Sequence, residues 1–163
     1  MAAMSTLPNP KDIKDLLDDL LGRPVTVGIA DPAVAADLNR ALVALYVDGS
    51  KQLTAVLGMD LPLAACAGAA IGLIPKGGAE AAVEDGELSP MIGENVSEVC
   101  NILAGLLNNQ PGAPHMKLYQ VHLPGEQAPP DAVSRLLALG ARLDLAIEIG
   151  GYGSGRFWLS LAG

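Results

Sequence analysis

One predicted helix, residues 89 to 108, carries polar residues whose types and spacing suit chemistry on a bound partner. They follow one another at intervals of four, three, four and three residues, which places them on one ridge of a helix: Glu94, Glu98, Asn101, Gly105 and Asn108. Glu98 and Asn101 lie one turn apart, so a carboxylate that can pair with a cation stands beside an amide that can accept and donate hydrogen bonds. Gly105 removes side-chain bulk one turn further along, so the backbone of a partner can approach closely there.

The opposite side of this helix is apolar, and a plain surface helix is therefore the alternative interpretation. The apolar stripe is formed by Ile92, Val96, Val99, Leu103 and Leu106. Such a stripe is expected to face a core, and polar ridges are common on amphipathic helices. Periodicity alone therefore favours a solvated face on which Gly105 only weakens the helix.

The remaining segments predict the frame that holds this helix. A helix over residues 10–21 has Asn9 as its cap, Pro10 at its first position and Gly22 at its left-handed exit. Asp48-Gly49-Ser50 predicts a hairpin turn between two strands. Strands are predicted at 25–29, 41–47, 52–57, 116–123, 141–149 and 157–161, and further helices at 61–73 and 131–139, the last capped by Gly140.

Two segments without such patterns are predicted to be loops, residues 76–87 and the glycine-rich residues 150–155. The glycine cluster does not fit a dinucleotide-binding loop, because Arg156 takes the place of the final glycine and a strand follows it. The element order predicts a single α+β domain over residues 10–163, after an N-terminal tail of residues 1–9. Its sheet is expected to be antiparallel or mixed, with two long helices and the N-terminal helix packed on it.

Composition excludes several classes of partner. The 163 residues carry 10 Lys plus Arg against 18 Asp plus Glu, a net charge of -8, which argues against binding nucleic acid or an anionic membrane surface. The longest uncharged run, residues 61–75, is shorter than the roughly 20 residues of a membrane-spanning helix. Cys66 and Cys100 lie among apolar residues and are expected to be buried and reduced. With no secretory signal at its start, the chain is expected to be cytoplasmic.

The helix is part of a longer sequence motif that is known from other proteins. Glu98-x-x-Asn101 is followed by Gly105 and, after the 22 residues from 102 to 123, by Pro124. This pattern resembles the CheC/CheX/FliY family of chemotaxis phosphatases, whose signature is an acidic residue or Ser, then E-x-x-N on a helix, then a distant Pro. The element order over residues 10 to 161 is similar to that of the CheX-like members with a single motif.

The resemblance implies a phosphatase that acts on the aspartyl phosphate of a CheY-like response regulator. In that family the Glu pairs with the active-site lysine of the regulator and the Asn positions the attacking water, so Glu98 and Asn101 would be the catalytic pair. Glu94, Gly105 and Pro124 would then contribute to docking. The family also implies a homodimer, no cofactor or metal held by this chain, and a Mg²⁺ ion that belongs to the regulator.

Two departures from the family pattern keep a second hypothesis open. Glu94 stands where the family typically has Asp or Ser, and Cys100 stands where better-known members have Gly. A non-catalytic adaptor that holds a regulator or a flagellar-switch partner is therefore the alternative function, and a structural domain without a regulator is a third. Residues 61–73 contain no E-x-x-N, so one active face per chain is expected.

Other chemically notable residues have plainer interpretations. His115 and His122 are seven residues apart around the start of a strand, an odd separation that places them on opposite faces, so a shared metal site is not expected. Trp158 lies on the last strand and either fills the edge of the core or contributes to a subunit contact.

Overall fold

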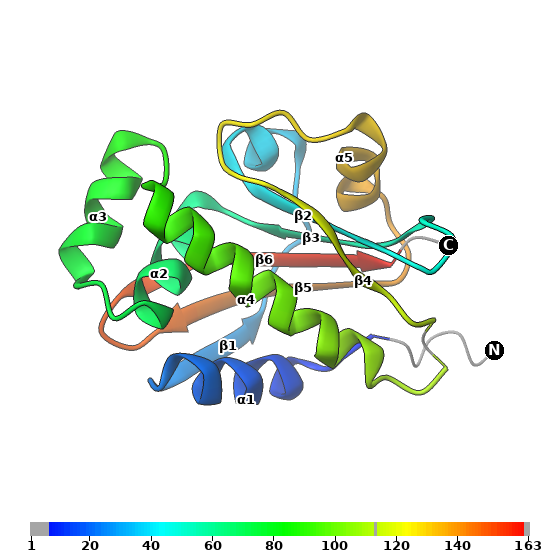
Figure 1. Cartoon of the computed structure of the whole chain (residues 1–163), viewed down its shortest axis with the longest axis horizontal. Coiled ribbons are helices and arrows are strands. Elements are labelled where there is room, and N and C mark those ends of the chain that lie inside the picture. Colours follow the sequence, from blue (N-terminus) through cyan, green and yellow to red (C-terminus); the bar gives the residue numbers. More distant parts are fainter. Residues whose placement is uncertain (1–6, 113, 162–163) are drawn as a thin grey trace.

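The computed structural model describes residues 7–112 and 114–161, in which one six-stranded sheet carries helices on both faces, as expected for an α+β domain (Figure 1). The helices of these residues are α1 (Pro10–Leu21), α2 (Leu61–Ile71), α3 (Lys76–Asp85), α4 (Pro90–Asn108) and α5 (Pro130–Leu137), with a 3₁₀ helix, η2, at Ala35–Arg40. The strands are β1 (Val25–Ile29), β2 (Leu42–Val47), β3 (Leu53–Met59), β4 (Lys117–His122), β5 (Arg142–Ile149) and β6 (Gly153–Leu161).

The sheet is antiparallel at every strand pairing in the described residues, with the order β1-β5-β6-β3-β2-β4. β2 and β3 form the predicted hairpin. Its turn is held by the Asp48 carboxylate, which accepts from the backbone N–H groups of Ser50 and Gln52 at 2.8 and 3.0 Å. β2 lies between β3 and β4 and is buried along its whole length, so its side chains have cover on both faces of the sheet.

One face of the sheet is covered by α1, α2 and α4, and α4 crosses the front of the view in Figure 1. α1 begins and ends as predicted. Asn9 and Asp12 exchange the two hydrogen bonds of a capping box, and Gly22 ends the helix in the left-handed region at φ 65°. The apolar side of α1 joins the same core as α2 and α4 through Ile13, Leu17 and Leu21.

The opposite face of the sheet is covered by α5 and the segment that leads into β2. Trp158 of β6 is only 1% exposed and lies in this second core with Leu136 of α5. Its side chain therefore fills the core, and none of it is available for a subunit contact at the surface. A buried ion pair, Arg142 with Asp144 at 2.8 Å, lies beside the end of α5. Arg142 also donates to the carbonyl of Ala138, where the helix ends earlier than the predicted Gly140 cap.

The loop predicted for residues 76–87 is wrong, because most of this segment forms α3. Gly77 and Gly78 lower the intrinsic helix propensity, which is why the sequence favours a loop. Ala79 and Ala82 are nevertheless buried in the main core, and Gly86 closes the helix at φ 78°. Burial of two small side chains against the neighbouring α2 thus outweighs the local preference.

The glycine-rich loop predicted at residues 150–155 is also corrected, because β6 already begins at Gly153. Only a tight turn remains, in which the N–H of Tyr152 donates to the carbonyl of Ile149 at 2.9 Å. Gly155 lies inside the strand, where a Cβ atom would collide with Asp60 and Leu63 at the start of α2. The glycine therefore serves close packing of a helix end on the sheet.

The predicted tail of residues 1–9 falls partly outside the described residues, which exclude 1–6. Leu7 packs against the main core, Pro8 is buried and Asn9 caps α1, so the described part of this segment is integrated into the fold. Both cysteines are buried with free thiols, as predicted. Across residues 7–112 and 114–161, no helix combines the length and apolar character needed to span a membrane.

Candidate functional site

The site is built on α4, whose sequence defines both its start and its two faces. The hydroxyl of Ser89 accepts from the N–H of Ile92 and caps the helix, and Pro90 occupies the first turn. The face toward the sheet is buried and consists of Ile92, Gly93, Val96, Val99, Cys100, Leu103, Ala104 and Leu107. The apolar stripe predicted from the sequence is thus the core face, apart from Leu106, which is half-buried.

The rotation of α4 is fixed by a close contact with α2. A Cβ atom at Gly68 would lie 2.5 Å from the carbonyl oxygen of Ile92, so only glycine lets the two backbones approach this closely. The side-chain amide of Asn95 donates to the carbonyl of Gly68 at 3.0 Å and also fills the space beside Gly72. These contacts leave the Glu98 side of α4 pointing away from α2.

A second contact holds α4 to the sheet at the motif itself. Cys100, within the E-x-x-N segment, is fully buried, and its backbone carbonyl accepts a 2.6 Å hydrogen bond from the hydroxyl of Tyr46 in β2. Burial raises the pKa of the Cys100 thiol to about 12. Cys100 is therefore buried, as predicted, and its thiol is not part of the exposed ridge.

The predicted site residues lie together on the solvent side of α4. Glu94, Glu98, Asn101 and Gly105 are all exposed. Within the described part of the chain, neither the two carboxylates nor the Asn101 amide makes a hydrogen bond or an ion pair with the protein. The ridge is therefore free to engage another molecule.

Asn108, the last member of the ridge, has a structural role instead. Its side-chain amide donates to the carbonyl of Met116 at 2.8 Å, and its side-chain oxygen accepts from the N–H of Met116 at 2.8 Å. This pair of bonds ties the end of α4 to the residue before β4. It fixes the position of α4 relative to β4.

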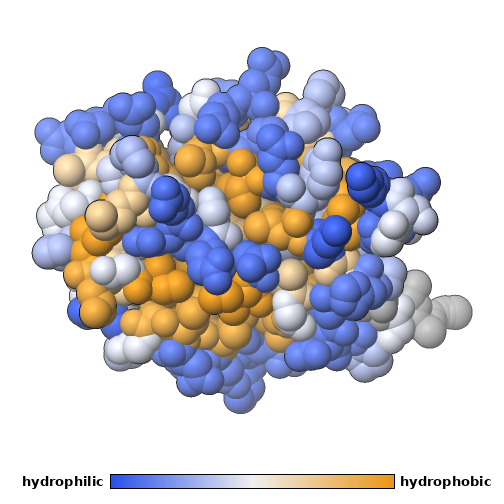
Figure 2. Space-filling model, viewed as in Figure 1, coloured by the Kyte–Doolittle hydropathy of each residue, from blue (hydrophilic) through white to orange (hydrophobic). Residues whose placement is uncertain are grey.

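Between α4 and β4 the surface is hollowed into a groove of about 580 Å³. The α4–β4 groove, as it is called below, is lined by Pro90, Gly93, Glu94, Ser97, Glu98, Asn101, Leu118 and Leu123. Figure 2 shows hydrophilic residues in blue along the course of α4 and hydrophobic residues in orange between α4 and β4. The sequence pattern missed Leu118 and Leu123, because they come from a separate element, β4 and the residue after it.

Pro124 occupies a different place from the other predicted docking residues. Its side chain is buried, and it lies in the turn that follows β4, next to Leu123 in the groove wall. Gly125 follows with φ 96°, which closes this turn in a conformation that suits glycine. A contribution of Pro124 to docking would therefore act through the shape of the turn and the position of Leu123.

The charges of the α4–β4 groove limit what it can bind by itself. Its lining contains two carboxylates, Glu94 and Glu98, and no Lys, Arg or His. A bare phosphate would be repelled unless its partner brought positive charge. No group of three or more His, Cys, Asp or Glu residues in the described chain is arranged to hold a metal ion. The arrangement can orient a water and pair with a cation that another molecule supplies.

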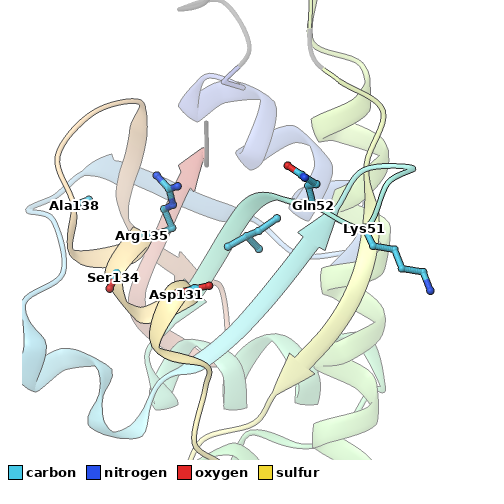
Figure 3. A pocket seen from close by; sticks show the side chains of 7 residues that line it. Lys51, Gln52, Asp131, Ser134, Arg135 and Ala138 are labelled. Carbon is cyan, nitrogen blue, oxygen red and sulfur yellow. The ribbon is translucent and has the colours of Figure 1, made fainter.

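A second hollow, about 640 Å³, lies between α5 and the β2–β3 hairpin, on the other face of the sheet. Figure 3 shows Asp131, Ser134 and Arg135 on α5 along one side of it, while the side chain of Lys51 points away from it. None of the predicted site residues lines this hollow.

Neither a protein-family model nor a curated protein matches this sequence. Solved structures do match the fold. The middle domain of FliM from H. pylori has a TM-score of 0.62 at 7% identity, covering 93% of this chain and 84% of that one. The FliM middle domain from Vibrio alginolyticus has a TM-score of 0.57 at 12% identity, covering 92% and 86%. Thermotoga maritima FliY has a TM-score of 0.54 at 19% identity, covering 99% and 84%.

These likenesses extend over nearly the whole described chain and concern the arrangement of its helices and strands. The chain therefore has the fold of FliY and of the FliM middle domain, and the fold implied by the E-x-x-N resemblance is confirmed.

Proposed function

We propose that this protein promotes hydrolysis of the aspartyl phosphate on a CheY-like response regulator, with Glu98 and Asn101 as the catalytic pair. The main support for the proposal is that these two side chains are exposed and, in the part of the chain that the structure describes, unpaired. Both side chains are exposed one turn apart, and neither has a partner within the described residues, on a helix held by Gly68 and Tyr46. A fold that fixes the helix and leaves two polar groups unpaired is suited to act on a second protein.

Asn101 would orient the attacking water. An acyl phosphate is already activated, so its hydrolysis needs chiefly a correctly placed water and neutralisation of the phosphoryl charge. The amide oxygen of Asn101 can accept a hydrogen bond from water while its NH₂ group donates elsewhere, and it adds no negative charge beside the phosphoryl oxygens.

Glu98 would pair with the active-site lysine of the regulator. Its carboxylate has no cation within the described chain, and a charge-assisted hydrogen bond to an ammonium group would hold the two proteins in register. The regulator would also bring the Mg²⁺ ion that neutralises the phosphoryl oxygens. This division of labour agrees with a groove that has two carboxylates and no cation in its lining.

The alternative is a non-catalytic adaptor that uses the same surface. Glu94 favours it, because it replaces the Asp or Ser of the family pattern with a longer side chain, which lines the groove beside Glu98 and Asn101. Cys100 does not favour either function, since this departure from the family pattern lies on the buried side of α4. An adaptor would bind the regulator without accelerating the loss of phosphate.

The decisive experiment is phosphate release from phosphorylated CheY-like regulators of the same organism, with Mg²⁺ and catalytic amounts of this protein. Wild type is compared with Asn101→Ala, and Asn109→Ala serves as control because Asn109 is exposed at the end of the same helix. We expect wild type and Asn109→Ala to accelerate release and a folded Asn101→Ala to have no effect. Binding without acceleration by wild type would rule out catalysis and favour the adaptor.

A further inference from the structure

The apolar floor of the α4–β4 groove is preformed. A Cβ atom at Gly93 would lie 2.9 Å from a terminal methyl carbon of Leu123, so the missing side chain lets Leu123 lie directly against the backbone of α4. The hydroxyl of Ser97 donates to the carbonyl of Gly93 at 2.8 Å and is therefore already engaged. Pro90 and Leu118 complete the apolar lining.

The wall that carries Leu123 is held by its own turn. The N–H of Leu123 donates to the carboxylate of Glu126 at 3.0 Å, and the N–H of Glu126 donates to the carbonyl of Leu123 at 2.9 Å. These reciprocal bonds hold the turn after β4 and therefore the position of Leu123 in the groove. An apolar side chain of a partner would enter a site that needs little reorganisation, which favours affinity.

The rim of the groove determines the charge of its occupant. Glu94 and Glu98 lie one turn apart at the edge of the apolar floor, and the ion pairs of the described residues all lie elsewhere. A lysine next to an apolar side chain complements this combination of carboxylates and apolar floor. A second copy of this chain is a poor occupant, because each copy carries a net charge of -8.

We propose that the α4–β4 groove is the specificity pocket for the regulator and takes an apolar side chain that neighbours the lysine bound by Glu98. The inference rests on the proposed function and adds to it. Glu98 and Asn101 act at the phosphorylated centre, while Gly93, Leu118 and Leu123 determine which receiver domains dock and how tightly. None of these three residues belongs to the E-x-x-N motif.

The test separates docking from chemistry in the phosphate-release assay. Leu123→Lys places a cation on the apolar floor, beside the site proposed for the partner lysine. Leu118→Ala removes part of the floor with less disturbance to folding. Both should raise the half-saturating regulator concentration by about tenfold, as expected for loss of an anchoring contact, and leave the rate at saturation unchanged. Leu139→Lys is the matched control, because Leu139 is 89% exposed in the segment after α5.

Asn101→Ala provides the opposite signature: it gives no acceleration at any regulator concentration, although it still binds the regulator as wild type does. Urea unfolding of each variant establishes that it is folded. If Leu118→Ala and Leu123→Lys both retain the wild-type half-saturating concentration, the groove is not a docking pocket, although the phosphatase function stands.

A separate probe decides the case in which wild type neither binds nor dephosphorylates any regulator, and the proposed function fails. The methyl signals of Leu118 and Leu123 are followed by NMR during titration with the blocked dipeptide N-acetyl-leucyl-lysine amide, and with N-acetyl-leucyl-glutamate amide as control. Shifts with the lysine peptide alone would support a pocket for an apolar group beside a cation. Equal shifts, or none, would overturn the inference.

Discussion

The hydroxyl of Tyr46 in β2 donates a 2.6 Å hydrogen bond to the carbonyl of Cys100, which directly precedes Asn101 and lies on the buried side of α4. Both Tyr46 and Cys100 have no solvent exposure. The bond therefore connects the central part of the sheet with the segment that presents the proposed catalytic pair. It also gives the only oxygen of the Tyr46 side chain a partner inside the core, which a buried hydroxyl requires.

Tyr46→Phe tests this connection. The ring would keep its packing, but the carbonyl of Cys100 would lose a buried donor, so we expect the free energy of unfolding to fall by about 1 kcal/mol. Urea denaturation measures the change. Tyr119→Phe is the control, because Tyr119 is 58% exposed and its variant should match wild type. An unchanged Tyr46→Phe would show that the bond contributes nothing net to stability.

Gly68→Ala tests the contact between α2 and α4. The added methyl group would lie 2.5 Å from the backbone oxygen of Ile92, which cannot rotate away as a side chain would. We expect a loss of about 2 kcal/mol in unfolding free energy, typical of overpacking in a core. Gly77→Ala, with nothing within 4 Å of its Cβ position in α3, should be neutral or stabilising. Equal stabilities of the two variants would contradict the close contact.

Gly105→Ala separates stability from docking. Gly105 is exposed inside α4 and its Cβ position has nothing within 4 Å, so alanine should stabilise the protein by about 0.5 to 1 kcal/mol. If a partner backbone approaches this position, the same variant should dephosphorylate the regulator less efficiently. Thermal unfolding and phosphate release measure the two effects. A more stable variant with full activity would remove Gly105 from the docking surface.

The buried thiols predict a specific response to pH. Burial raises the pKa of Cys100 from 9.0 to about 12, and burial is also the main cause of the raised pKa of Cys66. The unfolded chain therefore releases the Cys100 proton at lower pH than the folded chain does. The contribution of this thiol to stability is present below pH 9.0 and declines as the pH rises toward about 12.

Urea unfolding as a function of pH measures this decline, with Cys100→Ala as the reference without the ionisable group. The stability advantage of wild type over the variant should narrow above pH 9.0. Iodoacetamide at about pH 8 should leave Cys100 unmodified in the folded protein and alkylate it in urea, because the thiolate is the reactive form. Rapid alkylation of folded Cys100 would contradict its burial.

Local chemistry predicted most elements of this fold, and the exceptions share a physical cause. The Asn9 cap, the Gly22 exit and the Asp48 turn are local signals, and all three operate as predicted. Helix α3 was missed because two glycines oppose it locally while its alanines are stabilised only by contact with α2. The start of β6 was missed because glycines at 153 and 155 suit a loop, whereas pairing with β5 makes them part of a strand.

The candidate site likewise has a part that the sequence predicted and a part that it did not. The sequence alone determined that Glu94, Glu98, Asn101 and Gly105 share a ridge, because helical spacing within one segment is a local property, and their exposure in the structure agrees with it.

Only the tertiary structure decided what surrounds that ridge. Leu118 and Leu123 reach α4 because β4 pairs with the edge of β2, and Gly68 and Tyr46 fix the helix from elements far earlier in the chain. Pro124, expected to contribute to docking, is buried in the turn that follows β4. Such contacts join residues distant in sequence, and their geometry depends on how the sheet and helices pack together, which no periodicity within a segment encodes.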